Sequence, residues 1–305
     1  MIGFLPQPYL DELLYSICAR YSGWLQYPSR KSIIQELFGS AKASAIIDLP
    51  SRLDNFVAAL PLGHCYTVER LIDEHTLLPF YSPFLPSERV SHLRQDMEGD
   101  NGLLAQMRSG ITGSCIHLPK WLRFCPLCAE EDEKQFGGRY WHRLHQVPGV
   151  EVCPFHDVFL ENSKARVQAK RSRYELISAN QAIEKTSPRL LNSADPYHNV
   201  LLRIAQDAAW LLRQRKLVPG LESIRARYLW LLTDRNLASR EGKVRVTALL
   251  EAFKRYYPYD LLERLQCVPN EQDKNNWLFR LVRSPKQARH PLYHLLLIQF
   301  LGYTA

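Results

Sequence analysis

The sequence lacks the long apolar run that a membrane-spanning protein needs. Its most apolar stretch, residues 292–301, is interrupted by His294 and Gln299 and is shorter than the roughly 20 residues that cross a bilayer. The N-terminus also lacks the basic segment of a signal peptide and carries Asp11 and Glu12 early. With 46% hydrophobic and 23% charged residues, the composition is that of a soluble globular protein. At 305 residues, we expect two or three domains and a cytoplasmic location.

The motifs of several common enzyme classes are missing as well. The chain has no Walker-type glycine loop, no GxSxG nucleophile motif and no paired-carboxylate motif. A cysteine–histidine nucleophile is possible in principle, but the obvious candidates belong to a metal-binding pattern described below. We therefore predict that the protein is not an enzyme.

Cysteine is sparse, and its seven copies fall into two groups. Three belong to the metal-binding pattern, and the other four stand apart among apolar neighbours. For these four we expect buried positions in a reducing cytoplasm, where cysteine behaves as a small hydrophobic residue. They are Cys18, Cys65, Cys115 and Cys267.

The metal-binding pattern consists of two matched pairs. Cys125-Pro-Leu-Cys128 and Cys153-Pro-Phe-His156 are separated by 24 residues. In each pair two residues lie between the ligands, so one tight turn can aim both at a single ion, and two such turns supply the four corners of a tetrahedron. Each proline fixes φ in its turn. The alternatives are two coincidental turns or a CxxC redox pair, but a redox pair leaves the Cys-Pro-Phe-His sequence unexplained. We predict one structural Zn²⁺, in a site that is closed because four protein ligands leave no open position for a hydrolase.

The residues between the two pairs are aromatic and basic. Residues 139–150 are predicted to form a strand or a strand and turn, and Glu130–Glu133 a solvated acidic run. His142 and His145 are possible alternative ligands. Because four better-spaced ligands are already present, we expect these histidines to orient the metal site or to touch a partner.

Helical periodicity dominates the rest of the chain, which predicts a mainly α, multi-domain protein. We expect an N-terminal helical domain with a helix-turn-helix-like start (residues 1–118), a zinc-binding module (119–162) and a basic helical domain (163–305). The predicted helices cover residues 12–22, 31–38, part of 48–60, the first part of 66–81, 87–97, 196–212, 222–232, 246–256, 261–265 and 292–301.

Two apolar segments must be buried in the core or in contact with a partner. Pro79, Pro83 and Pro86 predict an extended path, and the aromatic residues beside them must pack in the core or form an interaction surface. These aromatic residues are Phe80, Tyr81 and Phe84. The helix at residues 292–301 is so apolar that it is either buried centrally or covered by something beyond residue 305.

The net charge of +8 is unevenly placed. Residues 1–150 carry a net charge of −2 and residues 151–305 a net charge of +10. This asymmetry suggests a partner-binding front half and a nucleic-acid-facing back half, although solvated helix faces would also explain it. The densest basic cluster is a candidate for phosphate contacts or a solvated linker. It contains Lys164, Arg166, Lys170, Arg171 and Arg173.

Four segments together resemble the TniQ/TnsD family. They are residues 4–16, residues 74–81, the cysteine block with residues 140–143, and residues 289–297. The resemblance implies a prokaryotic target-site selector for DNA transposition, which binds double-stranded target DNA or a CRISPR RNA-guided complex. It also implies recruitment of a TnsC-like AAA+ ATPase, by the N-terminal region, and through that ATPase of a transposase. The chain is intermediate in length between short TniQ proteins and the longest TnsD-type selectors. A stand-alone, zinc-containing, sequence-specific DNA-binding protein such as a transcriptional regulator is the alternative.

Overall fold

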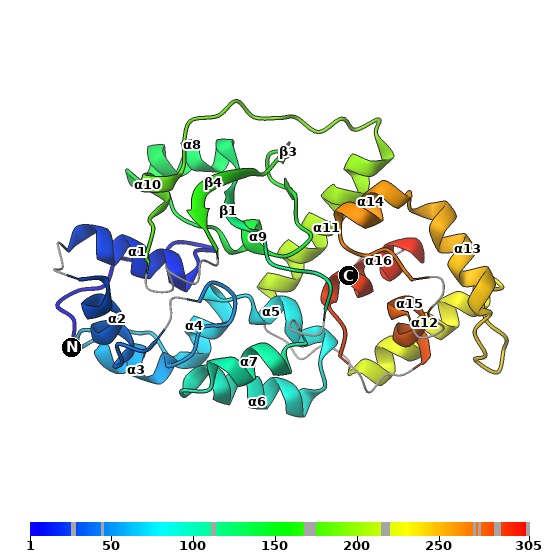
Figure 1. Cartoon of the computed structure of the whole chain (residues 1–305), viewed down its shortest axis with the longest axis horizontal. Coiled ribbons are helices and arrows are strands. Elements are labelled where there is room, and N and C mark those ends of the chain that lie inside the picture. The colour runs from blue at the N-terminus through cyan, green and yellow to red at the C-terminus, as the bar shows by residue number, and fades with distance from the viewer. Residues whose placement is uncertain are drawn as a thin grey trace.

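The computed structural model describes most of the chain. It covers residues 1–25, 29–43, 46–110, 114–167, 175–214, 220–270, 273, 276–283 and 288–302. These residues are mainly helical and contain four short strands near the middle of the chain (Figure 1). This confirms the predicted fold class. Within the described part of the chain, no helix is long and apolar enough to cross a membrane.

Four helices form the N-terminal region: α1 (Leu14–Trp24), α2 (Arg30–Phe38), α3 (Leu53–Ala59) and α4 (Val68–His75). The sequence suggests Ser29 as the N-cap and Gly39 as the end of α2, and the structure confirms both. Ser29 Oγ accepts a hydrogen bond from the backbone N–H of Ser32, and Gly39 ends the helix at φ 67°. Thr67 caps α4 in the same way. These caps fix where the apolar faces of the helices begin.

The proline-rich segment is helical, so the predicted extended path is wrong. Helix α5 (Leu78–Tyr81) and the 3₁₀ helix η1 (Ser82–Phe84) each carry a proline in the first turn, where no intrahelical N–H is required. The aromatic side chains of this segment are buried, which confirms the core alternative. Helices α6 (Ser87–Glu98) and α7 (Gly102–Arg108) follow.

The middle of the chain contains two small antiparallel strand pairs. Strand β1 (Trp121–Phe124) pairs with β4 (Glu161–Arg166), and β2 (Val152–Cys153) pairs with β3 (Val158–Phe159). Helices α8 (Pro126–Phe136) and α9 (Arg143–Gln146) lie between β1 and β2 in the sequence. The predicted strand at residues 139–150 is therefore wrong, because α9 occupies its centre.

The C-terminal part contains α10 (Ala179–Ala182), α11 (Pro196–Arg213), α12 (Leu221–Asp234), α13 (Val246–Tyr256), α14 (Tyr259–Arg264), α15 (Trp277–Arg283) and α16 (Pro291–Phe300). Helix α16 is buried along nearly its whole length, as its composition predicts. Tyr257 Oη donates a hydrogen bond to the carbonyl of Leu296 at 2.8 Å. Burial lowers the pKa of His294 to about 3, so its neutral ring can accept a hydrogen bond from Tyr228 Oη, 3.0 Å away.

Helix α9 joins the middle of the chain to the N-terminal helices. The sequence suggests Asp11 as the cap of the first helix, but α1 begins after the apolar Leu13. Asp11 instead caps α9: its carbonyl accepts from the N–H of Arg143 at 2.7 Å, and Oδ2 accepts from the N–H of Leu144 at 3.1 Å. The side-chain cap thus comes from a residue 133 positions before Leu144.

The buried side chain of Arg143 extends this junction. Its Nε donates to Asp11 Oδ1 at 3.1 Å, and one terminal nitrogen donates to the carbonyls of Asp73 and Thr76 at 2.7 and 3.2 Å. The other terminal nitrogen lies 3.4 Å from the carbonyl of Leu212 on α11. One guanidinium therefore contacts the N-terminal arm, the end of α4 and the end of α11.

The isolated cysteines do not share one environment. Cys18 and Cys267 are buried, as predicted, but Cys65 and Cys115 are exposed, so the prediction is wrong for these two. Both exposed residues lie in irregular segments outside the helices and strands, where neighbouring hydrophobic residues do not enforce burial.

We expect Arg143→Leu to lower the free energy of unfolding by about 3 to 5 kcal/mol, because it leaves the Asp11 carboxylate and buried carbonyls without their donor. Urea unfolding followed by far-UV circular dichroism measures this change. The control is Arg94→Leu, which removes a half-exposed ion pair to Asp73 and is expected to cost less than about 1 kcal/mol. Equal effects of the two variants would contradict the assigned role of Arg143.

Candidate metal centre

The four side chains of the predicted metal site come together. The ligand atoms of Cys125, Cys128, Cys153 and His156 all lie within 4.8 Å of one another. The three cysteines are buried and the histidine is half-buried. The sequence spacing therefore identified residues that the fold brings to one point.

Four of the six distances between the ligand atoms lie close to those of a tetrahedral zinc site. Zinc–sulfur bonds near 2.3 Å and zinc–nitrogen bonds near 2.0 to 2.1 Å imply edges of about 3.8 Å between sulfurs and about 3.6 Å from sulfur to nitrogen. Sγ of Cys128 lies 3.7 Å from Sγ of Cys153. His156 Nδ1 lies 3.3 Å from the sulfur of Cys128 and 3.6 Å from each of the other two. The donor set could thus hold one ion; that the ion is zinc stays a prediction.

Local structure explains how each pair is aimed. Cys125 is the N-cap of α8, and its Sγ accepts a hydrogen bond from the N–H of Cys128 at 3.4 Å. Pro126 occupies the first helical turn, where its fixed φ suits the helix. The second pair lies at the β2–β3 turn, which Asp157 closes at φ 51° with its N–H bonded to the carbonyl of Cys153. One pair is therefore held by a helix start and the other by a hairpin.

The three thiols cannot all ionise easily without a cation, because adjacent thiolates repel one another. Hydrogen bonds from Cys128 and Cys153 hold the pKa of Cys125 well below its usual range. The same contacts, together with burial, raise the pKa of Cys128. A bound divalent ion would favour all three thiolates at once, because it supplies the missing positive charge.

Carboxylates of α8 orient the histidines. Glu131 Oε1 lies 3.1 Å from Nε2 of His156, the ring nitrogen that faces away from the cysteines. Such a carboxylate fixes the tautomer of a ligating histidine and makes the other nitrogen a better ligand. Asp132 is buried and lies 2.9 Å from Nε2 of His142. The prediction that the acidic run is only solvated is therefore wrong for Glu131 and Asp132.

His142 and His145 surround the site without replacing a ligand. The rings of His142 and His145 pack against each other with centroids 4.8 Å apart. Nε2 of His145 is 4.0 Å from the sulfur of Cys128, at the limit of a hydrogen bond to sulfur. Burial keeps the pKa of His145 well below its usual value, so its ring is neutral. These positions agree with the expected orienting role.

The predicted phosphate-binding cluster is described only in part. Lys164 and Arg166 lie on β4, so this portion is a paired strand and not a linker. Lys164 forms an ion pair with Glu184, and the guanidinium of Arg166 lies over the Trp121 ring at 4.7 Å. The other three members lie outside the described residues. They are Lys170, Arg171 and Arg173.

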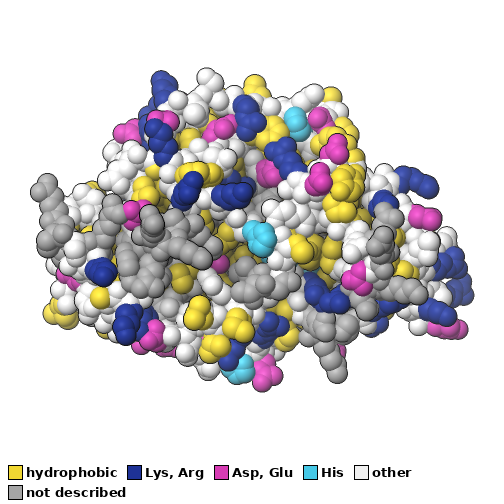
Figure 2. Space-filling model, in the orientation of Figure 1, with side chains coloured by type: hydrophobic (Ala, Val, Ile, Leu, Met, Phe, Trp, Pro, Cys, Tyr) yellow, Lys and Arg dark blue, Asp and Glu magenta, His cyan; other side chains and the backbone are white. Residues whose placement is uncertain are grey.

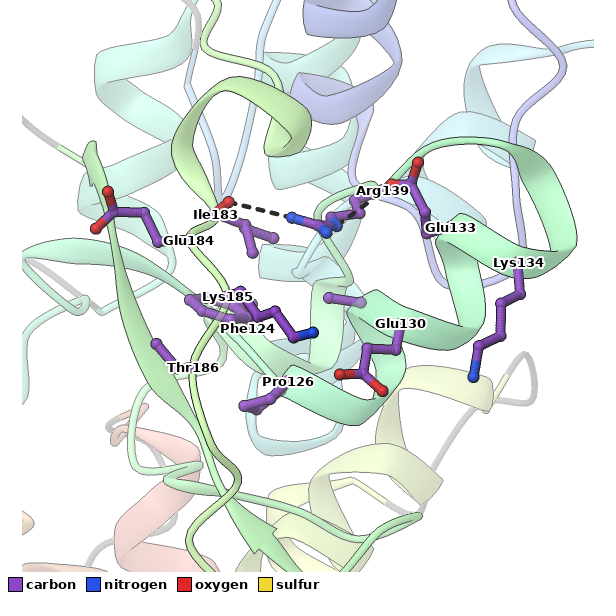
Figure 3. A pocket seen from close by; sticks show the side chains of 11 residues that line it. Phe124, Pro126, Glu130, Glu133, Lys134, Arg139, Ile183, Glu184, Lys185 and Thr186 are labelled. Carbon is purple, nitrogen blue, oxygen red and sulfur yellow. Dashed lines mark hydrogen bonds and ion pairs between the residues drawn. The ribbon is translucent and has the colours of Figure 1, made fainter.

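A pocket of about 310 Å³ lies beside the metal centre, between α8 and residues 183–186 (Figure 3). Its apolar lining includes Phe124, Pro126 and Ile183. Arg139 closes one side by donating to the carbonyl of Ile183 at 3.1 Å and pairing with Glu133. Three acidic and three basic side chains line it, so it does not select a ligand by charge. No sequence motif links its two walls, which is why sequence reasoning missed it.

Comparison with known proteins gives two matches in separate parts of the chain. Residues 4–160, more than half of the chain, match the TniQ family, and residues 204–305 match the family described as Tn7-like transposition protein D, TnsD. The chain is 28% identical over 299 residues to the transposon Tn7 transposition protein TnsD of Escherichia coli. That alignment covers 97% of this chain and 57% of the relative, so the chain spans little more than half of the relative's length.

We expect the purified protein to contain about one zinc ion per chain, and Cys125→Ser or Cys153→Ser to lose it together with thermal stability, since metal binding is coupled to folding of the module. Elemental analysis and thermal unfolding measure both changes. Cys115→Ser, which alters an exposed thiol, is the matched control and should keep both metal and stability. Metal-free wild-type protein would contradict the assignment.

Glu131→Gln tests the orienting carboxylate separately. The amide keeps the size of the side chain but removes its charge, so we expect metal affinity to fall about 10- to 100-fold. Competition with a chromogenic chelator measures the affinity. Glu130→Gln, on the neighbouring exposed position, is the control and should leave affinity unchanged. Identical affinities for all three proteins would remove Glu131 from the site.

Proposed function

The chain belongs to the TniQ family, and on that premise we propose that it selects target sites in DNA transposition. In this role it binds target DNA or a target-bound complex, such as an RNA-guided one, and recruits a TnsC-like AAA+ ATPase and a transposase. The observation that carries the proposal is the similarity to a Tn7 transposition protein over 97% of the chain. The protein would act as an adaptor and not as an enzyme.

The metal centre suits an adaptor. Three sulfur ligands and one nitrogen ligand fill a tetrahedron, and a catalytic zinc site keeps one position open for water or substrate. The ion would fix the relative positions of α8 and the β2–β3 hairpin, and with them the loop that carries α9. The ion would therefore stabilise the folded protein and take no part in a reaction.

We propose the same three parts as the sequence suggests. Residues 1–118 would bind the ATPase, residues 119–162 would form the zinc module, and residues 163–305 would bind DNA. The uneven charge supports this arrangement, since residues 151–305 carry a net charge of +10. The cluster from Lys164 to Arg173 remains a candidate for phosphate contacts. The Arg143 junction would keep the recruiting and DNA-facing parts at a fixed angle.

An apolar patch in the N-terminal region supports a protein partner there. Leu103 and Met107 on α7 are 81% and 61% exposed, and Leu104 lies beside them. Hydrophobic side chains gather on the surface over α6 and α7 (Figure 2). Exposed apolar patches of this kind mark protein–protein contacts. We assign this patch, Leu103, Leu104 and Met107, to the ATPase.

We expect Leu103→Ser/Met107→Ser to weaken association with the AAA+ ATPase of the same transposon at least about tenfold, because the variant removes apolar area that the complex would bury. Co-purification in the presence of ATP and double-stranded DNA measures association. The matched control is Leu62→Ser, which changes a leucine that is 88% exposed elsewhere in the N-terminal region. All three proteins should unfold at the same temperature.

Failure of the wild-type chain to associate with the ATPase under these conditions would contradict the adaptor role. Tight, salt-sensitive binding to one DNA sequence without any partner would then favour the alternative, a stand-alone DNA-binding regulator. If the α7 variant binds the ATPase as tightly as the wild-type chain does, the adaptor role stands, but the ATPase contacts a surface other than this patch.

A further inference from the structure

Helix α11 has one solvent-exposed face, and its side chains are arginine, glutamine and tryptophan, which commonly contact DNA. Its exposed residues after the first turn recur every three or four positions, which places them on one stripe. Arg203, Gln206, Trp210 and Arg213 form this stripe. Asn199 continues it toward the N-terminus, but its side-chain amide is bonded to the carbonyl of Ser193.

The stripe carries two positive charges and no acidic side chain. Helices α6, α8, α12 and α13 each expose at least one glutamate or aspartate, whereas α1, of the same length as α8 and α13, contains no acidic residue and is mostly buried. Asp207, the acidic residue of α11 itself, is buried. Arg215 and Lys216, outside the described residues, follow in the sequence. The two arginines therefore attract a polyanion to the stripe, and no carboxylate on the same face of the helix repels it.

The opposite face of α11 holds the helix rigidly. Leu201, Ile204, Ala208 and Leu211 are buried, and α11 packs against α4, α5, α9, β2 and α16. Asp195 caps its N-terminus by accepting from the N–H of Tyr197 at 2.8 Å. Figure 1 shows α11 crossing the middle of the molecule. A side chain on a helix fixed in this way keeps its position better than one on a loop.

The metal centre extends the stripe at its C-terminal end. Phe155, between the ligands Cys153 and His156, is 57% exposed, and the guanidinium of Arg213 lies 5.6 Å from its ring centroid. Trp210, one turn before Arg213, is 45% exposed. The contact between Arg213 and Phe155 thus joins the exposed face of α11 to the β2–β3 turn.

We propose that this surface, Arg203, Gln206, Trp210, Arg213 and Phe155, enters a groove of double-stranded DNA and determines sequence preference. The proposal rests on the proposed function, because it names the residues with which the chain would read its DNA target. Arginine and glutamine recognise guanine and adenine edges in the major groove, and apolar side chains contact the thymine methyl group. From Arg203 to Arg213 the helix rises about 15 Å, or roughly four base pairs.

The test begins with selection of preferred sequences from randomised duplexes by the wild-type chain. Affinity for the selected duplex is then measured by fluorescence anisotropy at two salt concentrations. Arg203→Ala and Arg213→Ala are each expected to weaken binding about 5- to 150-fold and to relax preference at one or two positions. Gln206→Ala should relax preference at a neighbouring position with a smaller loss of affinity.

The matched control is Arg255→Ala, which removes the same charge from an exposed position on α13 and should leave affinity and preference unchanged. Zinc content and unfolding temperature show whether each variant is folded. If the wild-type chain binds a selected duplex and the α11 variants keep its affinity and preference, this inference fails while the proposed function stands. If the wild-type chain binds no duplex, or prefers RNA of the same sequence, this inference fails, whereas the proposed function would then depend on a target-bound complex and on the ATPase association tested above.

Discussion

The buried guanidinium of Arg143 is the interaction on which the arrangement of this protein depends. It donates hydrogen bonds to Asp11 in the N-terminal arm and to two carbonyls at the end of α4, and it approaches the end of α11. A buried cation is tolerated only where such acceptors surround it, so those segments must be in place when the residue is buried. Side-chain contacts thus join parts of the chain that the sequence presents as separate.

The loop between the metal ligands contains Arg143, the centre of this junction. Cys128 and Cys153 bound the loop that carries Trp141 and Arg143. Trp141 is fully buried, with its N–H bonded to Ser16 on α1 and its indole N–H bonded to the carbonyl of Ile177. An ion that closes this loop reduces the conformational freedom of the very residues that reach the N-terminal helices. A structural metal would therefore stabilise contacts well beyond its own four ligands.

Sequence reasoning succeeded where a feature is local and failed where distant residues decide it. The spacing of the four ligands, the Ser29 cap and the apolar periodicity of α11 and α16 are all properties of short stretches, and the structure contains each of them as a local unit. The sequence suggests Asp11 as the cap of the first helix, whereas its partners, Arg143 and Leu144, lie 132 and 133 residues away. The proline-rich segment was expected to be extended because proline breaks helix interiors, yet each of its first two prolines lies in a first turn. The exposure of Cys65 and Cys115 likewise depends on tertiary packing.

Helix α11 shows how the fold can connect assembly with recognition. Its buried face touches the N-terminal helices, the metal-bearing hairpin and α16, whereas its exposed face ends beside Phe155 at the metal centre. The two faces belong to one helix, and the carbonyl of Leu212 near the end of that helix accepts a hydrogen bond from Arg143 at 3.4 Å. A ligand on the stripe would bias the N-terminal region only if that junction has two arrangements of similar energy. The density of hydrogen bonds around Arg143 argues for a single arrangement, and so for a rigid coupler.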